Sequence, residues 1–466
     1  MSIVPVPEGD FETSVSVLIV GAGAAGLCAA LSAAEAGADV LVLERDAVPR
    51  GSTALSAGLI PAAGTRFQRD HGIEDSSGTF AADIQYKAHG EADQAIVDLV
   101  AAGAGPLIEW LADRYSLPFS VVHDFNYPGH AARRMHGLPT RSGAELVDRL
   151  RQAVEEAELP VITEATVTSL FADNEGRIRG VEITRPDGVR DRIGCASLIL
   201  ACNGYGGNPE LVAKHIPEMR DALYFGHTGN RGDAVLWGEA LGARLAAMSG
   251  YQGHGSVAHP HGILISWAVV MEGGFQVNAD GERFSDESLG YSEQAAKVIA
   301  QPSGIAYDIF DERIAAIARQ FEDFRNAEAS GAVLEAPSIE RLAIRLKLPE
   351  AVLSWSFAEV EKLKKHGEDG FGRSFKGLPA LSPPFKAVRV TGGLFHTQGG
   401  LAIDTRARVL RIDGRPLPNL FAVGGAAAGV SGGQASGYLS GNGLLTATVL
   451  GRIAGQSAAS QHYPPR

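Results

Sequence analysis

Residues 15–26 read VSVLIVGAGAAG, a charge-free, β-branched stretch that runs directly into closely spaced glycines. This order predicts a buried strand over 15–20, a tight turn and an alanine-rich helix. In such a unit the first glycine, Gly21, makes the turn, and the second, Gly23, lets the backbone approach a pyrophosphate. The third, Gly26, lets the helix pack close to the strand, while the helix N-terminus attracts negative charge. The segment therefore predicts a dinucleotide site.

A second strand, DVLVLE, ends at Glu44, which lies 23 residues after Gly21. A carboxylate at this place can accept hydrogen bonds from a ribose 2′-OH. NAD and FAD share this half of the pattern, so the N-terminal segment does not choose between them.

The uncharged stretch 15–34 is long enough to resemble a membrane span. Its strand, glycine turn and helix composition argues against that interpretation. A signal peptide is also disfavoured, because the first fourteen residues carry Glu8, Asp10 and Glu12 but no lysine or arginine. We therefore expect a cytoplasmic protein without a membrane span.

Composition excludes several classes of partner. The chain has 466 residues, with 54 acidic and 41 basic side chains. This net negative charge does not attract nucleic acid or an anionic membrane. The length of the chain predicts two or three lobes. The three cysteines, Cys28, Cys195 and Cys202, form no C-x-x-C or zinc spacing. We expect a reducing compartment and chemistry without thiols or protein-bound metal.

The pattern of residues changes between 258 and 385, where a short β region is mixed with two long helical runs, 311–329 and 338–367. Glycine-rich strand character precedes and follows this segment. Before it, two strand-like segments, 161–173 and 176–188, are joined by a turn at 174–176, which predicts a hairpin. We therefore predict an α/β fold with a Rossmann-like dinucleotide-binding domain, formed by 1–257 and 386–466, that is interrupted by a smaller α+β capping domain over 258–385.

The carboxyl end favours FAD. A strand, LFAV, ends in Gly424 and Gly425 and is followed by a helix that starts near GNGLL. This arrangement resembles the second flavin contact of FAD enzymes, where backbone N–H groups and a helix N-terminus meet the ribityl chain and the flavin O2. The acid usual after the first glycine is replaced here by Gly425.

Together these segments resemble the fumarate reductase/succinate dehydrogenase flavoprotein superfamily. The resemblance continues through STALSAG, SLILACNGYGGN, GYQGHG, VNADGERFSDE and TGGLFHTQGGLAID. It implies an FAD lobe with an inserted capping lobe and an active site between them. Covalent-flavin members carry a histidine in the segment that here reads GSTALSAGL, so non-covalent FAD is implied. The implied cofactor-binding residues are Gly21, Gly23, Ala25, Gly26, Glu44, Arg45, Ser52, Thr53, Ser56, Gly58, Val167, Cys202, Asn203, Gly204, Gly424, Gly425, Asn442 and Leu444.

The active-site positions of the superfamily are only partly kept. Its two histidines that hold the substrate carboxylate match His254 and His396, whereas its two arginines match Tyr291 and Tyr438. Without these cations a dicarboxylate would lose charge-assisted, bidentate contacts. Fumarate and succinate are therefore disfavoured as substrates.

The two tyrosines fit another branch, the 3-ketosteroid Δ1-dehydrogenases. The resemblance implies that Tyr291 takes an α-proton and that Tyr438 polarises the ketone oxygen with a backbone N–H from Gly441 or Asn442. A free phenol has a pKa of about 10, so Tyr291 needs a positive charge, hydrogen bonds or the flavin to lower its pKa. His254 or His396 can supply such a donor or hold a polar group of the substrate.

These observations predict an FAD-dependent dehydrogenase that forms a C=C bond α,β to the carbonyl of a cyclic ketone, of ketosteroid or oxocyclohexanecarboxylate type. The electron acceptor can be a quinone, oxygen or a redox protein. One alternative keeps the fold and reverses the direction, giving an enoate or enone reductase. Another is a non-catalytic FAD-binding protein. Separately, each tyrosine could simply pack its ring, and His254 could be an exposed loop residue.

Three further features of the sequence indicate less about function. The segment HAARRMHGLPTRSG, 130–143, fits either a loop beside the cofactor or a solvated charge cluster. Arg283 and Glu287 are expected to hold the capping lobe rather than to react. The tryptophans show no pattern and are expected in the core: Trp110, Trp237, Trp267 and Trp355.

Overall fold

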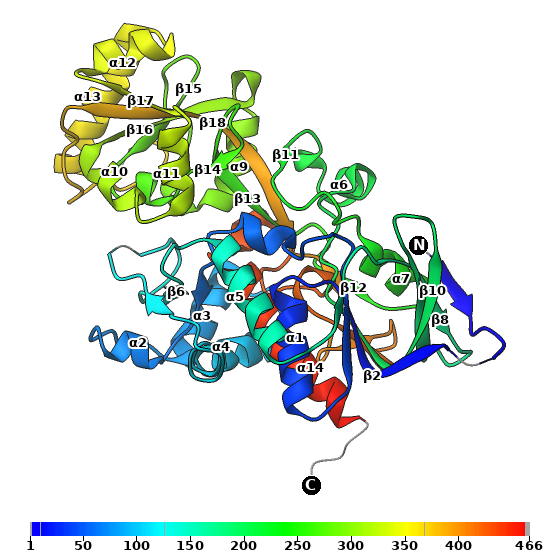
Figure 1. Ribbon diagram of the computed structural model, residues 1–466. Helices are drawn as coiled ribbons and strands as arrows, with labels where there is room; N and C mark the ends of the chain where they lie inside the picture. The colour runs from blue at the N-terminus through cyan, green and yellow to red at the C-terminus, as the bar shows by residue number, and fades with distance from the viewer. Residues whose placement is uncertain (1, 10, 125, 368, 462–466) are drawn as a thin grey trace.

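The predicted glycine turn joins a buried strand to a helix in the larger of two lobes (Figure 1). The structure is a computed structural model that describes residues 2–9, 11–124, 126–367 and 369–461. The backbone of the larger lobe is a mixed sheet in the order β1 (Ser2–Pro5), β8 (Thr166–Ala172), β9 (Ile178–Thr184), β10 (Arg190–Leu200), β2 (Thr13–Val20), β3 (Val40–Leu43) and β7 (Val161–Ile162).

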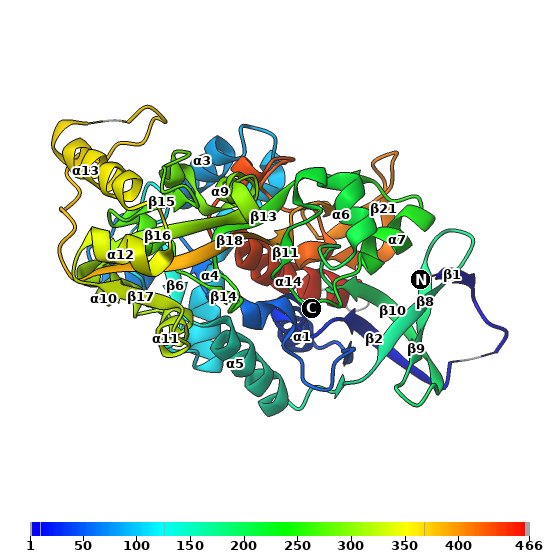
Figure 2. The same ribbon diagram turned by 90° about the horizontal axis from the view of Figure 1, so that it is seen from above.

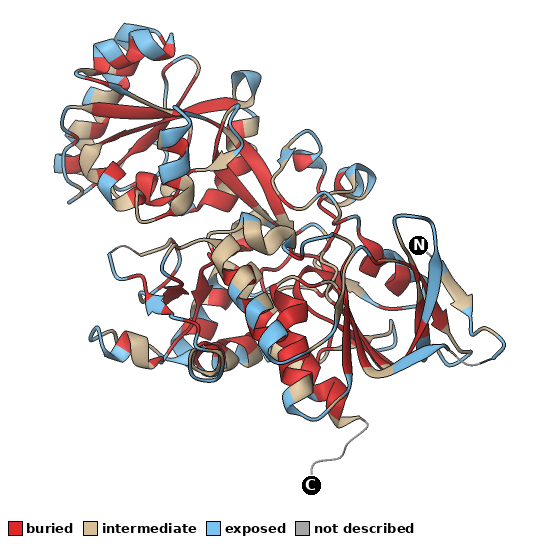
Figure 3. Cartoon of the chain, in the orientation of Figure 1, coloured by how far each residue is buried: buried red, intermediate tan, exposed pale blue. Residues whose placement is uncertain are grey.

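Two strands join this sheet off that path: β21 (Pro416–Ala422) pairs in parallel with β10, and β20 (Arg408–Leu410) pairs with β21. The strands β10, β2 and β3 are parallel neighbours. Their apolar runs are buried, as is usual where helices cover a parallel sheet (Figure 3). The predicted hairpin joined at 174–176 is formed by β8 and β9.

Helix α1 (Ala24–Glu35) packs along the C-terminal helix α14 (Asn442–Ser460). The contact is close because both helices present small residues. A Cβ on Gly451 would lie 2.4 Å from the Ala25 carbonyl oxygen, and one on Gly455 would lie 2.3 Å from that of Ala29. Part of the glycine excess therefore serves helix packing.

The other helices of this lobe are α2 (Arg66–Arg69), α3 (Ser77–Lys87), α4 (Gln94–Tyr115), α5 (Gly143–Glu156), α6 (Pro209–His215) and α7 (Asp233–Ala240). Its short strands are β4 (Ile60–Pro61), β5 (Ser120–Val121), β6 (Met135–Gly137), β12 (Leu245–Ala246) and β19 (Gly400–Leu401). Helix α4 is long and apolar enough to cross a membrane by length and composition alone, and half of its most apolar window is buried here against the protein. That is weak evidence for a span, and the cellular location stays a prediction.

The capping lobe has its own sheet, in the order β14 (Ile263–Leu264), β13 (Tyr251–Ala258), β18 (Phe385–Thr397), β16 (Ile305–Asp311) and β15 (Phe275–Asn278). Two more strands, β11 (Leu223–Tyr224) and β17 (Val333–Ala336), pair with β18. Figures 1 and 2 show β13 and β18 running from this lobe toward the larger one. A separate apolar core extends from Ala258 to Val390. The proposed domain boundaries at 258 and 385 stay predictions.

The capping helices are α8 (Ala268–Met271), α9 (Tyr291–Ile299), α10 (Glu312–Ala318), α11 (Glu322–Ala329), α12 (Ile339–Leu346) and α13 (Glu350–His366). Each long helical run expected here is therefore divided in two. Between α12 and α13, Lys347 adopts a left-handed conformation and Pro349 caps the next helix, so the first cannot continue.

The expectation that all tryptophans are core residues is wrong for one of them. Trp237 and Trp267 are buried, but Trp355 on α13 is 64% exposed. Because no periodic apolar pattern surrounded these residues, the sequence held no signal for which side of a helix they would occupy.

Candidate active site

A cavity with about 1770 Å³ of space free of atoms, part of it open to solvent, receives side chains from both lobes. It extends from the glycine turn after β2 to the aromatic residues on α9 and before α14. Most of the predicted site residues line it. Gly26, Gly204 and Asn442 do not.

The three glycines of the turn have different surroundings. A Cβ on Gly21 would lie 2.5 Å from the Ala201 carbonyl oxygen, and one on Gly26 only 1.9 Å from that of Gly21. Both glycines are thus required by protein packing. Gly23 faces the cavity, where an added Cβ would meet only the Thr53 hydroxyl at 3.4 Å. A side chain here would fill the space that a pyrophosphate needs at the start of α1, so the turn fits a dinucleotide.

Glu44 follows β3 and is held by the backbone. Its carboxylate accepts hydrogen bonds from the Ala22 N–H at 2.8 Å and from the Asp46 N–H at 3.1 Å. This fixed, buried carboxylate retains acceptor capacity toward the cavity, as binding to a ribose requires. Arg45, by contrast, is engaged within the protein, because its guanidinium pairs with Asp233 at 2.7 Å.

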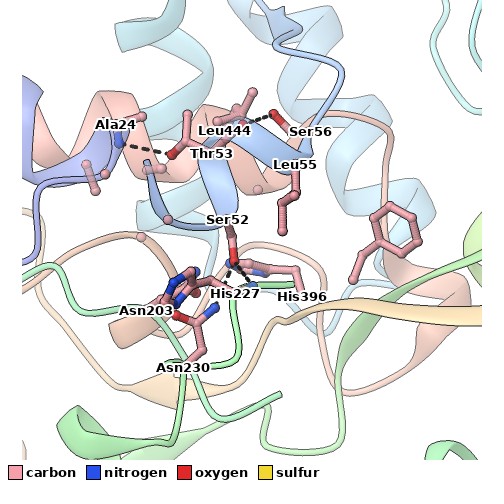
Figure 4. A pocket seen from close by; sticks show the side chains of 18 of the residues that line it. Ala24, Ser52, Thr53, Leu55, Ser56, Asn203, His227, Asn230, His396 and Leu444 are labelled. Carbon is pink, nitrogen blue, oxygen red and sulfur yellow. Dashed lines mark hydrogen bonds between the residues drawn. The ribbon is translucent and has the colours of Figure 1, made fainter. Parts of the chain in front are cut away.

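The segment 51–58 forms a second wall of the cavity (Figure 4). The Thr53 hydroxyl accepts the Ala24 N–H at 3.0 Å, and the Ser52 hydroxyl accepts the His227 N–H at 3.0 Å and the Asn230 amide at 2.8 Å. Ser56 donates to the Thr53 carbonyl at 2.7 Å. These contacts order the loop at the helix N-terminus.

The opposite wall of the cavity is formed by the segment 227–233, which no sequence pattern indicated and which contributes His227, Asn230 and Asp233. His227 Nε2 lies 2.8 Å from an Asp46 carboxylate oxygen. The glycines and polar residues of HTGNRGD were the available signal. They lie about 180 residues from the loop that they contact, and local patterns do not reveal such pairings.

Three of the remaining cofactor candidates, Gly58, Cys202 and Asn203, lie in loops. Gly58 has a positive φ and approaches the Ser142 carbonyl, and Asn203 also has a positive φ. Cys202 lines the cavity with its thiol protonated, because burial raises its pKa to about 12. Ala25, Val167 and Leu444 give the wall apolar surface.

The missing acid after Gly424 has a steric explanation. A Cβ on Gly425 would lie 2.1 Å from Asn203 Oδ1 and 2.8 Å from His396 Nε2. No side chain larger than hydrogen fits between these two polar groups. Asn203 and His396 therefore occupy the volume that an acidic side chain at 425 would need.

Three of the predicted catalytic residues, His254, Tyr291 and Tyr438, gather in one aromatic cluster, although they come from distant segments. The His254 ring stacks on Tyr291 with centroids 4.7 Å apart, and the Tyr291 and Tyr438 rings are 6.1 Å apart. Trp267, which the sequence analysis placed in the core, meets His254 edge-on at 5.4 Å and also lines the cavity. A third tyrosine, Tyr127, packs against the cluster.

The two tyrosine hydroxyls differ in their partners. The Tyr438 oxygen accepts the Gly443 N–H, at 3.3 Å, beside the start of α14. Burial raises the pKa of Tyr438 to about 12, and the N–H groups of Gly443 and Gly441 partly oppose this rise. Burial and the neighbouring Tyr438 raise the pKa of Tyr291 well above its ordinary value, although a hydrogen bond to Ser440 lowers it. On balance the protein's own groups thus raise the Tyr291 pKa, and a lowering by the flavin stays an expectation.

Both histidines of the site are neutral. Burial lowers the pKa of His254 to about 3 and that of His396 to about 4. His254 Nδ1 accepts the Ser256 N–H at 3.1 Å, so its proton is on Nε2. His396 Nδ1 lies 2.9 Å from the Gln398 side-chain amide. His254 is buried on β13, and the alternative of an exposed loop histidine is wrong.

The segment 130–143 supports the cavity from behind. Arg134 is fully buried and pairs with Asp75 at 2.8 Å and with Asp83 at 2.5 Å. His130 accepts from Arg134 at 3.2 Å, and its Nε2 donates to the Ser440 carbonyl at 3.0 Å. The network holds the Ser440 loop, and a solvated charge cluster is excluded.

A profile of the FAD binding domain family matches residues 16–444. The chain belongs to this family. It is 32% identical to a probable fumarate reductase of Shewanella frigidimarina over 97% of this chain and 76% of that protein. The resemblance to the fumarate reductase/succinate dehydrogenase flavoproteins is thereby confirmed, as is FAD as the cofactor.

Two solved structures extend the comparison. The open conformation of a flavocytochrome c3 fumarate reductase has a TM-score of 0.81 and 30% identity, covering 97% of this chain and 79% of that one. A 3-ketosteroid-Δ4-(5α)-dehydrogenase from Rhodococcus jostii RHA1, in complex with 4-androstene-3,17-dione, has a TM-score of 0.76 and 25% identity, covering 97% and 98%. The chain described here is thus an FAD-dependent oxidoreductase acting on CH–CH bonds, and it has the predicted α/β fold.

The capping lobe of this flavoprotein is held by buried charges. Glu287 pairs with Arg283 at 2.6 Å and with Arg373 at 2.8 Å, and Arg283 also pairs with Asp369. These contacts agree with the expectation that Arg283 and Glu287 hold the capping lobe together. Among the described residues, no group of three or more His, Cys, Asp or Glu side chains is arranged to hold a metal ion.

Asp308 on β16 is a fully buried carboxyl without a cationic partner among the described residues. It accepts hydrogen bonds from Ser256 and from Gln276, the latter at 2.8 Å. Burial raises its pKa to about 7. Because the folded-state pKa exceeds the unfolded one, its contribution to stability is fully present below about pH 4 and is lost as the pH rises through about 7, a change of about 4 kcal/mol.

The variant Asp308→Asn should therefore change how stability depends on pH. We expect the wild-type unfolding temperature to fall more steeply than that of the variant between pH 5 and pH 8, as measured by thermal unfolding of the holoprotein. The variant loses an acceptor and should be less stable at pH 5 but gain relative stability at pH 8. Parallel pH profiles of the two proteins would contradict the ionisation of Asp308.

Proposed function

We propose that this flavoprotein is a dehydrogenase that introduces a C=C bond α,β to the carbonyl of a cyclic ketone. The observation that carries the proposal is the pairing of Tyr291 and Tyr438 on the cavity wall. Among the described lining residues the only lysine or arginine is Arg45, and its charge is engaged by Asp233. A neutral carbonyl suits this end of the cavity better than a dicarboxylate.

Tyr438 is suited to polarise the carbonyl. Its oxygen accepts the Gly443 N–H, which strengthens its own O–H as a donor to a developing enolate oxygen. Gly441 contributes a second N–H near the same oxygen. Asn442, the other candidate donor, is fully buried and directs its side-chain amide to Ser431 at 3.0 Å.

Tyr291 is suited to accept the α-proton. It lies beside Tyr438 and interacts with Ser440, which can orient its hydroxyl. The neutral His254 stacks on the Tyr291 ring and keeps it in place. FAD, when bound, supplies the acceptor for the hydride that leaves the β-carbon. The predicted cofactor-binding residues and non-covalent attachment are part of this proposal.

The experiment that tests the proposal is an anaerobic titration of the oxidised holoprotein with a panel of cyclic ketones. Loss of the visible absorbance of the oxidised flavin supports dehydrogenation. Unchanged absorbance with every saturated ketone, together with reoxidation of the dithionite-reduced protein by an enone, would contradict it.

That second outcome would support the runner-up, an enone or enoate reductase. Its specific support is the 32% identity to a probable fumarate reductase. The paired tyrosines, and the lack of a free cation among the lining residues that the structure describes, favour an uncharged enone over an enoate in this case as well.

Replacing Tyr438 with phenylalanine should slow flavin reduction by a factor of about 10²–10³, the usual cost of removing one donor to an oxyanion. Stopped-flow measurement of flavin reduction by ketone checks the effect. Tyr86→Phe is the matched control, because Tyr86 is 83% exposed and does not line the cavity. Equal rates in the two variants would remove Tyr438 from the mechanism.

A further inference from the structure

Next to the two tyrosines, the cavity is lined mainly by apolar and aromatic side chains. Phe225 and Phe395 stack with ring centroids 4.5 Å apart, and Phe395 lies 5.5 Å from His254. Leu264 on β14 and Phe321 before α11 add apolar surface from the capping lobe. Such a wall accepts a hydrophobic ring body.

One charged side chain interrupts this apolar wall. Asp323 stands in the first turn of α11 and lines the cavity, two residues after Phe321. Its carboxylate has no hydrogen bond or ion pair with any residue that the structure describes. Burial, and then the charge of Glu322, raise its pKa to about 6, while Arg325 opposes the rise. The carboxylate is thus costly to keep where it is.

A helix dipole alone does not explain this residue. Acidic side chains are ordinary in the first turn of a helix, where they face the unpaired N–H groups. Glu322 already supplies such a charge to α11, and it does not line the cavity. Asp323 adds a second carboxylate, which is half-buried and faces the cavity.

Phe321, two residues before Asp323, belongs to a different apolar cluster from the two tyrosines, and Tyr127 packs against both clusters. The neighbouring Phe321 packs in an apolar cluster with Leu59, Met135 and Ala268. The reactive tyrosines belong to a different cluster with Trp267. A ligand whose carbonyl meets Tyr438 would therefore present a different part of its body to Asp323.

We infer that Asp323 is a specificity-determining residue that binds a hydroxyl or amino group of the substrate, placed on the ring body away from the reacting carbonyl. The same carboxylate repels substrates with a carboxylate in that position. This inference rests on the proposed function and narrows its substrate class: hydroxylated or amino-substituted ring ketones are favoured over oxocyclohexanecarboxylates.

The test measures binding rather than turnover. The dithionite-reduced holoprotein is titrated calorimetrically with saturated ketones, which it cannot oxidise. Two probe sets cover two lengths: cyclohexanones carrying a 4-methyl, 4-hydroxy, 4-amino or 4-carboxylate group, and a 3-ketosteroid pair with a 17-oxo or 17-hydroxy group. A failure of the proposed function shows as no flavin reduction, whereas a failure of this inference shows as no discrimination in Kd.

At pH 8 we expect the amino or hydroxy probe of at least one set to bind about tenfold to hundredfold more tightly than its methyl or oxo partner, the range of a hydrogen bond to a charged group. Asp323→Asn should remove most of that advantage, and Asp323→Lys should reverse the order in favour of the carboxylate probe. The advantage should also shrink as the pH falls below about 6, where Asp323 takes up a proton.

Glu322→Gln is the matched control, since it removes a charge from the same helical turn without altering the cavity wall. It should leave the ratio of Kd values unchanged. Flavin content and unfolding temperature establish that each variant is folded. Equal Kd values for all probes of both sets in the wild type, or an unchanged ratio in Asp323→Asn, would overturn the inference.

Discussion

Replacing Tyr291 with phenylalanine should lower the rate of flavin reduction by a cyclic ketone by a factor of about 10²–10⁴, the range for removal of a general base. The residue lies within the aromatic cluster, and its ring contacts do not need the hydroxyl. The variant should therefore keep its fold and its flavin. Rapid-mixing absorbance of the anaerobic holoprotein measures the rate.

The pH dependence of the rate of flavin reduction gives a second test of the role of Tyr291. The pKa of Tyr291 lies well above its ordinary value because the residue is buried. The form that accepts a proton is scarce at neutral pH, so the wild-type rate should rise with pH by about tenfold per unit. Tyr291→Phe should lose this slope. A reductase that uses Tyr291 as an acid would show a flat profile at neutral pH, because the acid form is fully populated.

Tyr86→Phe serves again as the control for loss of a phenol at an exposed position. It should show the wild-type rate and slope. Near-normal turnover in Tyr291→Phe, with the slope retained, would exclude Tyr291 as the proton acceptor.

Replacing Gly23 with valine should weaken FAD binding by about a hundredfold, the effect of losing a good contact to a charged phosphate. The protein around Gly23 leaves an added Cβ in open space apart from Thr53. The apoprotein should thus fold normally and fail to take up flavin. Fluorescence titration of the apoprotein with FAD measures the loss.

Two other glycines make the result specific. Gly370→Val changes a position with nothing within 4 Å of the added Cβ and should bind FAD normally. Gly26→Ala forces a Cβ to within 1.9 Å of the Gly21 carbonyl oxygen and should lower the stability of the fold itself. A yellow Gly23→Val protein with full flavin content would contradict the dinucleotide site.

Local sequence patterns predicted much of the fold. The strand, turn and helix around the first glycines follow from side chains within about twenty residues of one another, and this short range makes them readable. The hairpin of β8 and β9 and the closing helix α14 were also found in this way. The two divided helical runs were missed, because single positions such as Lys347 ended an otherwise continuous pattern.

The site was predictable only in part. Resemblance to a family placed His254, Tyr291 and Tyr438 in one site, and the structure brings all three to one cavity. It gave no signal for Asp323, since an acidic residue in a helical first turn has an ordinary explanation. It also did not reveal that burial raises the Tyr291 pKa, because burial depends on neighbours from several distant segments.

The sequence by itself determined the strand–glycine–helix unit, for which residue identity and short spacing suffice. Its resemblance to a family indicated the cofactor class and the replacement of two cations by tyrosines. The tertiary structure decided which groups meet and what charge they carry. Gly425 lacks a side chain because Asn203 and His396 occupy its space, and His254 is neutral because it is buried. Distances and desolvation belong to the packed chain, and no local pattern contains them.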